Sequence, residues 1–322
     1  MKDLNIHNKF KKALVTGGAG FVGSHLVDSL LDDGLHVISI DDYSGGKESN
    51  LAHHKNNLKL QEIKCDITNY DELKKYFDGV DIVFHQAVSK MTVCLKDPRR
   101  DLQVNAEGTF NLLELSRDFG VKKFVHASTG SVYGIAKDFP TDEFHQLNPA
   151  SYYGVSKLAG EKYVRLFSDL YDLDATILRY YHVYGPRQES SDVGGVVSIF
   201  ARRALENKPL IIYGDGTQIR SFTYVKDIVN LNKLVAVTPE TKGEAYNCAS
   251  GIKVSIQELA NKVLKSLDKE NIEITYKDWK IGDIKYFDVS NEKIQSIGAS
   301  WNNNFEKGLD ETLSWSKNWF SK

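Results

Sequence analysis

Thr16-Gly17-Gly18-Ala19-Gly20-Phe21-Val22-Gly23 lies between two segments with different periodicities. The preceding residues 13–16 form a short apolar, β-branched run that predicts a buried strand, and residues 21–31 carry apolar side chains at helical spacing. The glycines match the pattern GxGxxG, which permits a tight turn, close approach of the backbone to a pyrophosphate and close packing of helix on strand. Free N–H groups at the start of the helix would face the phosphates. This stretch therefore predicts a dinucleotide-binding turn.

The segment after the predicted helix strengthens this interpretation. GxGxxG alone is weak evidence, because glycines often only mark turns. Here residues 36–40 predict a second strand, which ends in Asp41-Asp42, close to the distance expected for a carboxylate that binds the adenosine ribose. A carboxylate at this place accepts a hydrogen bond from the ribose 2′-OH and repels a 2′-phosphate. The sequence therefore favours NAD over NADP as the cofactor.

The overall composition excludes several classes of protein. The 322 residues suffice for a large α/β domain and a smaller one, and the net charge of −2 does not indicate nucleic acid or an anionic membrane as a partner. The three cysteines are widely spaced and form neither a disulfide framework nor a metal-binding pattern, as is typical of the cytoplasm. No apolar run approaches the ~18 residues of a membrane span, and the polar N-terminus does not resemble a signal peptide. We expect a soluble, cytoplasmic protein.

The loop of residues 43–57 is rich in Ser, Gly, Asn and His and contains the pair His53-His54. Two neighbouring histidines could bind a metal ion, but no carboxylate or cysteine lies at ligand spacing in the sequence. We therefore predict a solvated surface loop and no metal site.

Strands and helices alternate along the first half of the chain. Further strands are predicted at residues 58–63, 80–85, 123–127 and 175–179, and further helices at 71–77, 105–119 and 151–171. This alternation predicts an α/β fold with a doubly wound parallel sheet, whose ligands bind outside the carboxyl ends of the strands. Beyond residues 184–187 the alternation loosens. We predict a cofactor-binding domain over 1–180, to which segments within 224–250 return, and a smaller α/β substrate domain over 181–322.

Tyr153 and Lys157 lie four residues apart at the start of a predicted helix, so both side chains share one face. A tyrosine becomes a useful base only if its pKa falls from about 10 toward 7, which requires roughly 4 kcal/mol of stabilisation of the phenolate. A lysine one turn away and a positive nicotinamide ring could supply it together. Thr129 could donate a hydrogen bond to the same substrate oxygen.

Seven motifs together resemble the extended short-chain dehydrogenase/reductases that act on nucleotide sugars. They are TGGAGFVGSHL (16–26), HQA (85–87), STGSVYG (128–134), YYGVSK (152–157), LRYYHVYGPRQ (178–188), YGDGTQIRSFTYVKD (213–227) and GD (282–283). The resemblance extends from about Lys12 to Trp315. It implies a Rossmann-like domain that holds NAD, and a C-terminal domain that closes over a nucleoside-diphosphate sugar.

The resemblance also assigns roles to individual residues. The catalytic residues would be Thr129, Tyr153 and Lys157. Residues that contact NAD would be Gly17, Gly20, Phe21, Val22, Gly23, Asp41, Asp42, Asp66, Ile67, Gln86, Ala87, Lys90, Asn105, Tyr153, Lys157 and Tyr181. Substrate-binding residues would be Thr129, His182, Arg187, Gln188, Tyr213, Arg220 and Asp283. Two simpler interpretations stay open, since Asn105 could merely start a helix and Arg220 could form a surface ion pair.

Two departures from the family pattern bear on the reaction. Members that eliminate water carry Asp-Glu directly after the catalytic Thr, and decarboxylating members usually keep the Glu, whereas this chain has Gly130-Ser131. Neither residue can supply a general acid or base, which favours epimerisation at C4 of a UDP-sugar through a transient 4-keto intermediate. The alternatives are an NAD(P)-dependent reductase or dehydrogenase, a 4,6-dehydratase and a non-catalytic NAD-binding protein. The second departure is His182, where the common pattern has Asn.

The resemblance finally implies a homodimer. The predicted helices 105–119 and 153–171 would form a four-helix bundle between subunits, and both carry wide apolar faces. One of these faces must also pack on the sheet, so the sequence alone does not decide the oligomeric state.

Overall fold

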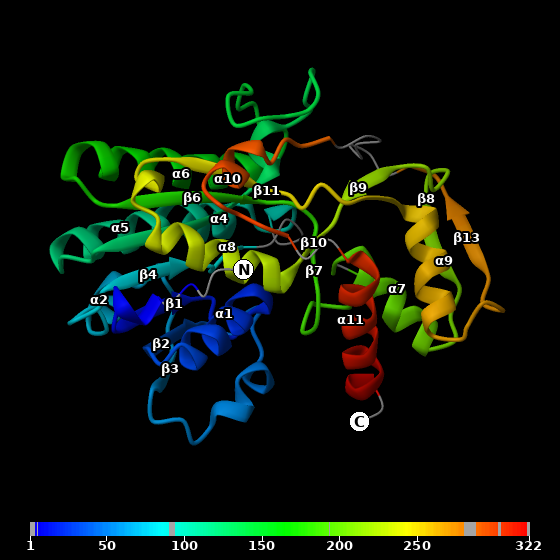
Figure 1. The fold of residues 1–322 in the computed structure, drawn as a ribbon, viewed down its shortest axis with the longest axis horizontal. Coiled ribbons are helices and arrows are strands. Elements are labelled where there is room, and N and C mark those ends of the chain that lie inside the picture. The colour runs from blue at the N-terminus through cyan, green and yellow to red at the C-terminus, as the bar shows by residue number, and fades with distance from the viewer. Residues whose placement is uncertain are drawn as a thin grey trace.

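The computed structural model describes residues 4, 6–89, 94–192, 194–279, 288–301 and 304–320. In this part of the chain a seven-stranded sheet has the strand order β11-β6-β5-β4-β1-β2-β3, with every neighbouring pair parallel (Figure 1). Its strands are β1 (Lys12–Thr16), β2 (His36–Asp41), β3 (Leu60–Lys64), β4 (Ile82–His85), β5 (Lys123–Thr129), β6 (Ala175–Tyr180) and β11 (Ala245–Cys248). This confirms the predicted α/β fold with a Rossmann-like parallel sheet.

The chain order of the sheet reverses beside β1. β2 and β3 follow on one side of β1, while β4, β5 and β6 extend the sheet on the other side. The carboxyl ends of β1 and β4 therefore border the crevice where ligands of such sheets bind. The central strands are buried almost throughout, which explains why they appear in the sequence as continuous apolar runs.

Helices cover both faces of the sheet. One face packs against α1 (Phe21–Asp32) and α8 (Val225–Val237), and the other against α5 (Gly108–Asp118) and α6 (Tyr152–Tyr171). The shorter helix α2 (Tyr70–Lys74) adds Leu73 to the core between the sheet and helices α5 and α6. No helix of the described residues is long and apolar enough to cross a membrane.

A separate apolar core holds the elements on the right of Figure 1 together. They are β7 (Val183–Tyr184), α7 (Val196–Leu205), β8 (Leu210–Tyr213), β9 (Ile219–Ser221), β10 (Thr223–Tyr224), β12 (Lys253–Ser255), α9 (Ile256–Ser266), β13 (Ile274–Lys277) and α11 (Phe305–Phe320). Between these segments the chain returns to the large sheet, because β11 pairs with β6 and α10 (Glu292–Ser296) packs against β11.

The predicted helix 105–119 differs from the observed structure at its start. The chain is helical from α4 (Pro98–Leu102) through a π-helical turn (Gln103–Glu107) into α5. Asn105 lies inside this turn rather than at a helix start, so the simpler interpretation of Asn105 was wrong. Its side-chain amide donates to Asp101 Oδ1 at 2.9 Å and to Ser156 Oγ at 3.1 Å. Such π-turns often occur at functional sites.

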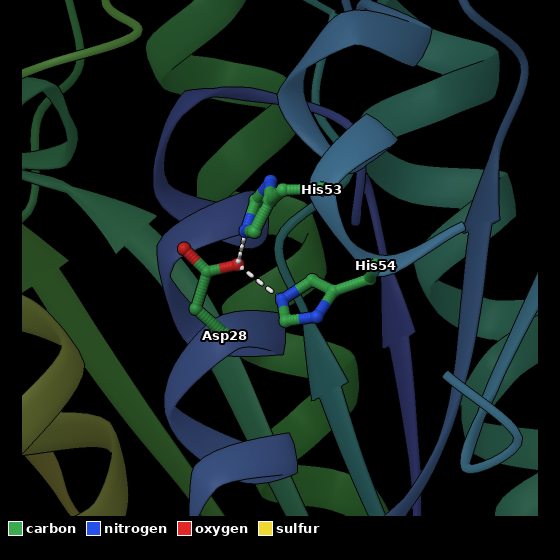
Figure 2. A group of neighbouring side chains, drawn as sticks. All are labelled: Asp28, His53 and His54. Atoms are coloured by element: carbon green, nitrogen blue, oxygen red, sulfur yellow. Dashed lines mark hydrogen bonds and ion pairs between the residues drawn. The ribbon is translucent and has the colours of Figure 1, made fainter. Parts of the chain in front are cut away.

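The connection between β2 and β3 is anchored on α1 rather than merely solvated. It contains two short 3₁₀ turns, Glu48–Asn50 and Ala52–His54. His53 Nε2 and His54 Nε2 lie 3.0 and 2.8 Å from the same oxygen, Oδ1 of Asp28 on α1 (Figure 2). This carboxylate partner could not be recognised from the sequence pattern, because only the folding of the loop onto α1 brings it near.

A buried ion pair fixes α6 against the sheet. Arg179 on β6 and Glu161 on α6 are each 1% exposed, and Arg179 donates to Glu161 through Nη2 at 2.7 Å and Nε at 3.0 Å. Ser128 also donates to Glu161, and Arg179 donates to the Tyr133 hydroxyl. Burial alone would lower the pKa of Arg179, but the hydrogen bonds and charge of Glu161 outweigh burial and raise it. Arg179 is therefore charged, and the hydrogen-bonding atoms of both side chains have partners.

We expect Glu161→Gln to lower the free energy of unfolding by about 3–5 kcal/mol, because it leaves the Arg179 guanidinium buried without a counter-charge. The measurement is urea unfolding followed by circular dichroism. Glu206→Gln is the control, since Glu206 pairs with Lys208 near the surface and should cost less than about 1 kcal/mol. Equal midpoints for the two variants would contradict the importance of the buried pair.

Candidate active site

A cavity of about 360 Å³ lies at the carboxyl ends of the strands. The predicted cofactor residues that line it are Gly17, Gly20, Phe21, Val22, Gly23, Asp41, Asp42, Asp66, Ile67, Gln86, Ala87 and Tyr153. These residues come from the ends of several strands and from the start of α1 and of α6. The structure thus brings together most of the set predicted for the cofactor.

The glycine turn is packed too closely for any larger side chain. A Cβ on Gly17, whose φ is +65°, would lie 2.7 Å from Ala87 N, and a Cβ on Gly23 would lie 2.0 Å from Gly17 O. Helix α1 begins directly afterwards, and no side chain caps its N-terminus. The backbone N–H groups there are therefore available to a pyrophosphate, so the turn fits a dinucleotide.

The carboxylate at the end of β2 is held by the backbone. Asp41 accepts hydrogen bonds from Ala19 N at 3.0 Å and from Tyr43 N at 2.8 Å. These bonds tie the end of β2 to the glycine turn, so that the predicted ribose-binding carboxylate and the predicted pyrophosphate-binding turn keep a fixed separation.

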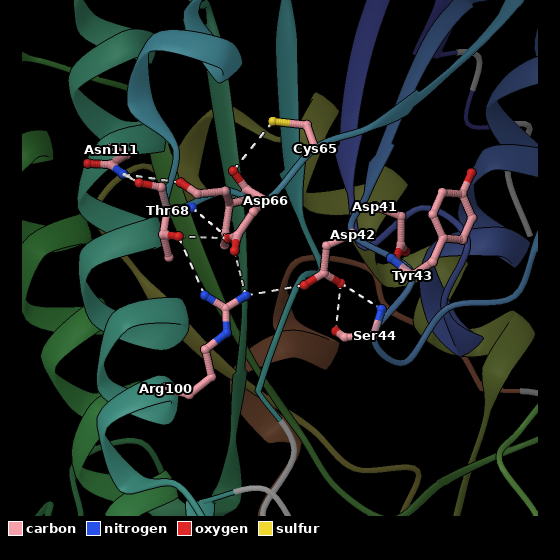
Figure 3. Close-up of polar contacts among 10 residues, drawn as sticks. Asp41, Asp42, Tyr43, Ser44, Cys65, Asp66, Thr68, Arg100 and Asn111 are labelled. Carbon is pink, nitrogen blue, oxygen red and sulfur yellow. Dashed lines mark hydrogen bonds and ion pairs between the residues drawn. The ribbon is translucent and has the colours of Figure 1, made fainter.

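Arg100 links two further carboxylates of the cavity (Figure 3). Its Nη2 lies 3.2 Å from Asp42 Oδ2 and 2.7 Å from Asp66 Oδ2. Burial alone would raise the pKa of Asp66, but hydrogen bonds from Thr68 and Arg100 hold it below its usual value. Sequence reasoning missed Arg100, because it belongs to no motif and reaches the cavity only through the position of α4.

Asn105 supports the cavity wall from behind. Ser89, which lines the cavity, donates its N–H to Asn105 Oδ1 at 2.9 Å. Since the Asn105 amide also bonds α4 and α6, this buried side chain positions the segment after β4 without lining the cavity itself.

The three predicted catalytic residues come from β5 and α6. Thr129 ends β5, and Tyr153 and Lys157 lie in the first two turns of α6, which begins where Ser151 accepts a hydrogen bond from Gly154 N. Burial lowers the pKa of Lys157 to about 8. Burial raises the pKa of Tyr153 to about 12, although a hydrogen bond with Thr129 partly offsets this rise. The free protein therefore holds Tyr153 as a neutral phenol, which needs added positive charge to act as a base near neutral pH.

The first position after Thr129 leaves no room for a side chain, and the second holds a serine. A Cβ on Gly130 would lie 2.3 Å from Cε1 of Tyr181. The Thr129 hydroxyl donates to Ser131 Oγ at 3.2 Å, so Ser131 holds Thr129 in place. Gly130 is thus required by packing against Tyr181.

Tyr180, rather than the predicted Tyr181, lines the cavity. The Tyr180 hydroxyl donates to Gln86 Oε1 at 3.1 Å, while Tyr181 packs in a separate apolar cluster with Val132. Tyr180 is the last residue of β6, so its place at the carboxyl end of a strand was the signal that could have identified it.

The predicted substrate residues fall into different surroundings. Burial, and then the charge of Arg220, lower the pKa of His182 to about 3, so His182 is neutral and lies close to Arg220. Arg220 is 8% exposed, which makes the surface ion pair a wrong interpretation. Arg187 lines the cofactor cavity and pairs with Asp28 at 2.8 Å.

The remaining predicted residues lie apart from the cavity or outside the described residues. Gln188 donates through Nε2 to Val183 O at 2.6 Å, and Tyr213 ends β8, where its carbonyl accepts from Gln218. Lys90 and Asp283 lie outside the described residues.

Comparisons with known proteins agree with the fold. A putative UDP-glucose 4-epimerase of Methanocaldococcus jannaschii is 36% identical over 308 residues, which cover 95% of this chain and 98% of that protein. The structure of a UDP-N-acetylglucosamine 4-epimerase of Methanobrevibacter ruminantium in complex with UDP-N-acetylmuramic acid superposes with a TM-score of 0.92 at 34% identity, covering 96% of this chain and 99% of that one. The UDP-glucose 4-epimerase of Thermotoga maritima with UDP-glucose gives 0.90 at the same identity and coverage.

The family is broader than these epimerases. Matching relatives also include a UDP-glucuronic acid decarboxylase and a dTDP-D-glucose 4,6-dehydratase, so similarity alone does not decide the reaction. The model of the NAD dependent epimerase/dehydratase family matches residues 13–249. On this match and on the relatives that span the chain, the protein belongs to the NAD dependent epimerase/dehydratase family, and NAD is its cofactor.

Proposed function

We propose that the protein is an NAD-dependent epimerase that inverts C4 of a nucleoside-diphosphate sugar, with a UDP-sugar as substrate. The observation that carries the proposal is the set Thr129, Tyr153 and Lys157 beside Gly130-Ser131, because this set can move one proton but adds no second acid or base. The UDP-sugar 4-epimerases among the relatives and solved structures support the choice of substrate class.

Each catalytic residue has a separate task in this reaction. Tyr153 Oη takes the proton of the C4 hydroxyl, and Thr129 Oγ1 hydrogen-bonds to the same sugar oxygen. The buried ammonium of Lys157 favours the phenolate form of Tyr153. NAD bound in the cavity would supply the acceptor and donor of the C4 hydride, and its oxidised ring would add positive charge beside Tyr153. The 4-keto sugar turns over within the site, and Tyr153 gives the proton back to O4.

The competing reactions need groups that these positions lack. Elimination of water across C5–C6 and decarboxylation use an acid or base directly after the catalytic Thr in the members that the sequence resembles, and Gly130 is held against Tyr181. A net reductase remains the second candidate, since Thr, Tyr and Lys also serve reduction. Such an enzyme would consume added NADH in proportion to product, whereas an epimerase would not.

The exposed face of α6 indicates how the protein assembles. We propose a homodimer formed by α5 and α6, because α6 presents apolar side chains to solvent on the face that does not pack on the sheet. They are Val155, Tyr163, Leu166 and Leu170. Burial of such a face between two subunits is a common way to cover it.

We further propose a cytoplasmic location. The free, buried cysteines Cys65, Cys94 and Cys248 fit this proposal.

We expect the purified holoenzyme to convert one UDP-sugar into its C4 epimer without added NAD, as measured by NMR on a panel of UDP-, dTDP- and GDP-sugars. Tyr153→Phe should lower the rate about 10²–10⁴-fold, because it removes the proton acceptor. Tyr152→Phe is the matched control, since Tyr152 is exposed and should keep its activity. A Tyr153→Phe variant of nearly full activity would exclude Tyr153 as the base.

We expect Lys157→Met to shift the acid limb of the kcat/KM profile to higher pH, because loss of the buried charge raises the pKa of Tyr153. Since the pKa of Lys157 is about 8, the wild-type charge is present below this pH and is lost above it. The ratio of wild-type to variant activity should therefore be largest at neutral pH and shrink in alkali. Lys162→Met, an exposed change on the same helix, is the control, and a pH-independent ratio would contradict the electrostatic role.

We expect the wild-type protein to sediment as a dimer and the double variant Leu166→Asp/Leu170→Asp to sediment as a folded monomer. The two charges would lie in the apolar face of α6, where burial without a partner is costly. Leu58→Asp serves as control, because Leu58 is exposed far from α6 in the loop before β3. A monomeric wild-type protein would refute the proposed interface.

A further inference from the structure

We propose that Asp28, His53 and His54 form a binding site for a divalent transition-metal ion of the zinc class. Among the described residues, these three are the one group whose imidazole and carboxylate ligand atoms gather in this way, all within 4.8 Å of one another. Asp28 lies on α1 and the two histidines on the β2–β3 connection (Figure 2).

The distances between the ligand atoms are close to those of a metal site. His53 Nε2 and His54 Nε2 lie 3.0 and 2.8 Å from Asp28 Oδ1. Zinc bonds of ~2.0 Å in tetrahedral geometry require ligand atoms about 3.3 Å apart. A small outward movement of each ring would therefore admit an ion between all three atoms, with a water molecule as the fourth ligand.

The chemistry of the ligands selects the kind of ion. Two imidazole nitrogens and one carboxylate oxygen suit Zn²⁺, Co²⁺ or Ni²⁺, whereas Mg²⁺ and Ca²⁺ prefer oxygen ligands alone. The ion would be reached from solvent beside His53, whose side chain is 48% exposed, while that of His54 is 14% exposed.

Arg187 holds the carboxylate in place for this role. Its Nη1 lies 2.8 Å from Asp28 Oδ2, which is the oxygen that the histidines do not contact. The carboxylate thus has one oxygen directed to the histidines and the other held by a guanidinium, an arrangement in which an outer partner orients a ligand. The nearby positive charge weakens the site but does not occupy the oxygen that the ion needs.

The ion would link two parts of the cofactor site. The connection that carries His53 and His54 also supplies Ser44, Lys47 and Asn50 to the cofactor cavity, and Arg187 lines the same cavity. A bond between this connection and α1 would fix the wall of the cavity over the adenosine end of the cofactor. This role needs no participation of the ion in catalysis.

The test is titration of tag-free, chelator-treated holoenzyme with Co²⁺, followed by the visible absorption of the bound ion. We expect one Co²⁺ per chain, displacement by Zn²⁺ and no displacement by Mg²⁺. His53→Gln and Asp28→Asn should abolish the absorption, whereas His36→Gln, which changes an exposed histidine on β2, should leave it unchanged. His53 is the preferred position for the variant, because it is the more exposed of the pair and its loss leaves the His54–Asp28 contact.

A second measurement, the thermal midpoint of unfolding, distinguishes loss of metal binding from misfolding of a variant. Zn²⁺ should raise the thermal midpoint of the wild type and of His36→Gln, because an ion bound only by the folded state stabilises it, and it should not shift the midpoint of His53→Gln. Absence of stoichiometric Co²⁺ binding, or equal binding by wild type and His53→Gln with native melting curves, would overturn the proposal and leave a purely hydrogen-bonded contact.

Discussion

The candidate site depends on the tight packing of the glycine turn against its neighbours. A Cβ on Gly18 would lie 2.2 Å from Ser39 Oγ on β2, and one on Gly17 would meet the segment after β4. The turn is thus wedged between the ends of β2 and β4. Because α1 starts from this turn, the same contact sets the position of the helix N-terminus, of Asp41 and, through Asp28, of the loop beyond β2.

Local pattern predicted most of the sheet and much of the cavity. The strands around Val15, Val83 and Phe124 are buried on both sides, so their apolar runs are visible in the sequence. The turn after the strand of Val15 needs glycine for steric reasons. Tyr153 and Lys157 were identifiable because their spacing of four residues is a property of one helix. Such features are determined by residues that are close together in the chain, so they can be predicted from the sequence alone.

The features that the sequence did not predict depend on contacts between distant segments. Arg100 reaches Asp42 and Asp66 across the cavity, and the two histidines meet a carboxylate on another helix. Tyr180 and Tyr181 are adjacent and of the same type, so only the direction in which the strand presents each side chain separates the cavity residue from the core residue. No spacing rule within the chain contains that information.

The return of the chain to the large sheet has a consequence for biosynthesis. Helix α8 covers the same face as α1, and β11 completes the edge beside β6, yet both follow α7 and β8, which belong to the separate core on the right of Figure 1. A chain emerging from the ribosome therefore exposes the apolar face of α1 and the edge of β6 until residue 248 has been synthesised. Cotranslational folding of the amino-terminal layer must stay incomplete during that interval, when protection by chaperones matters most.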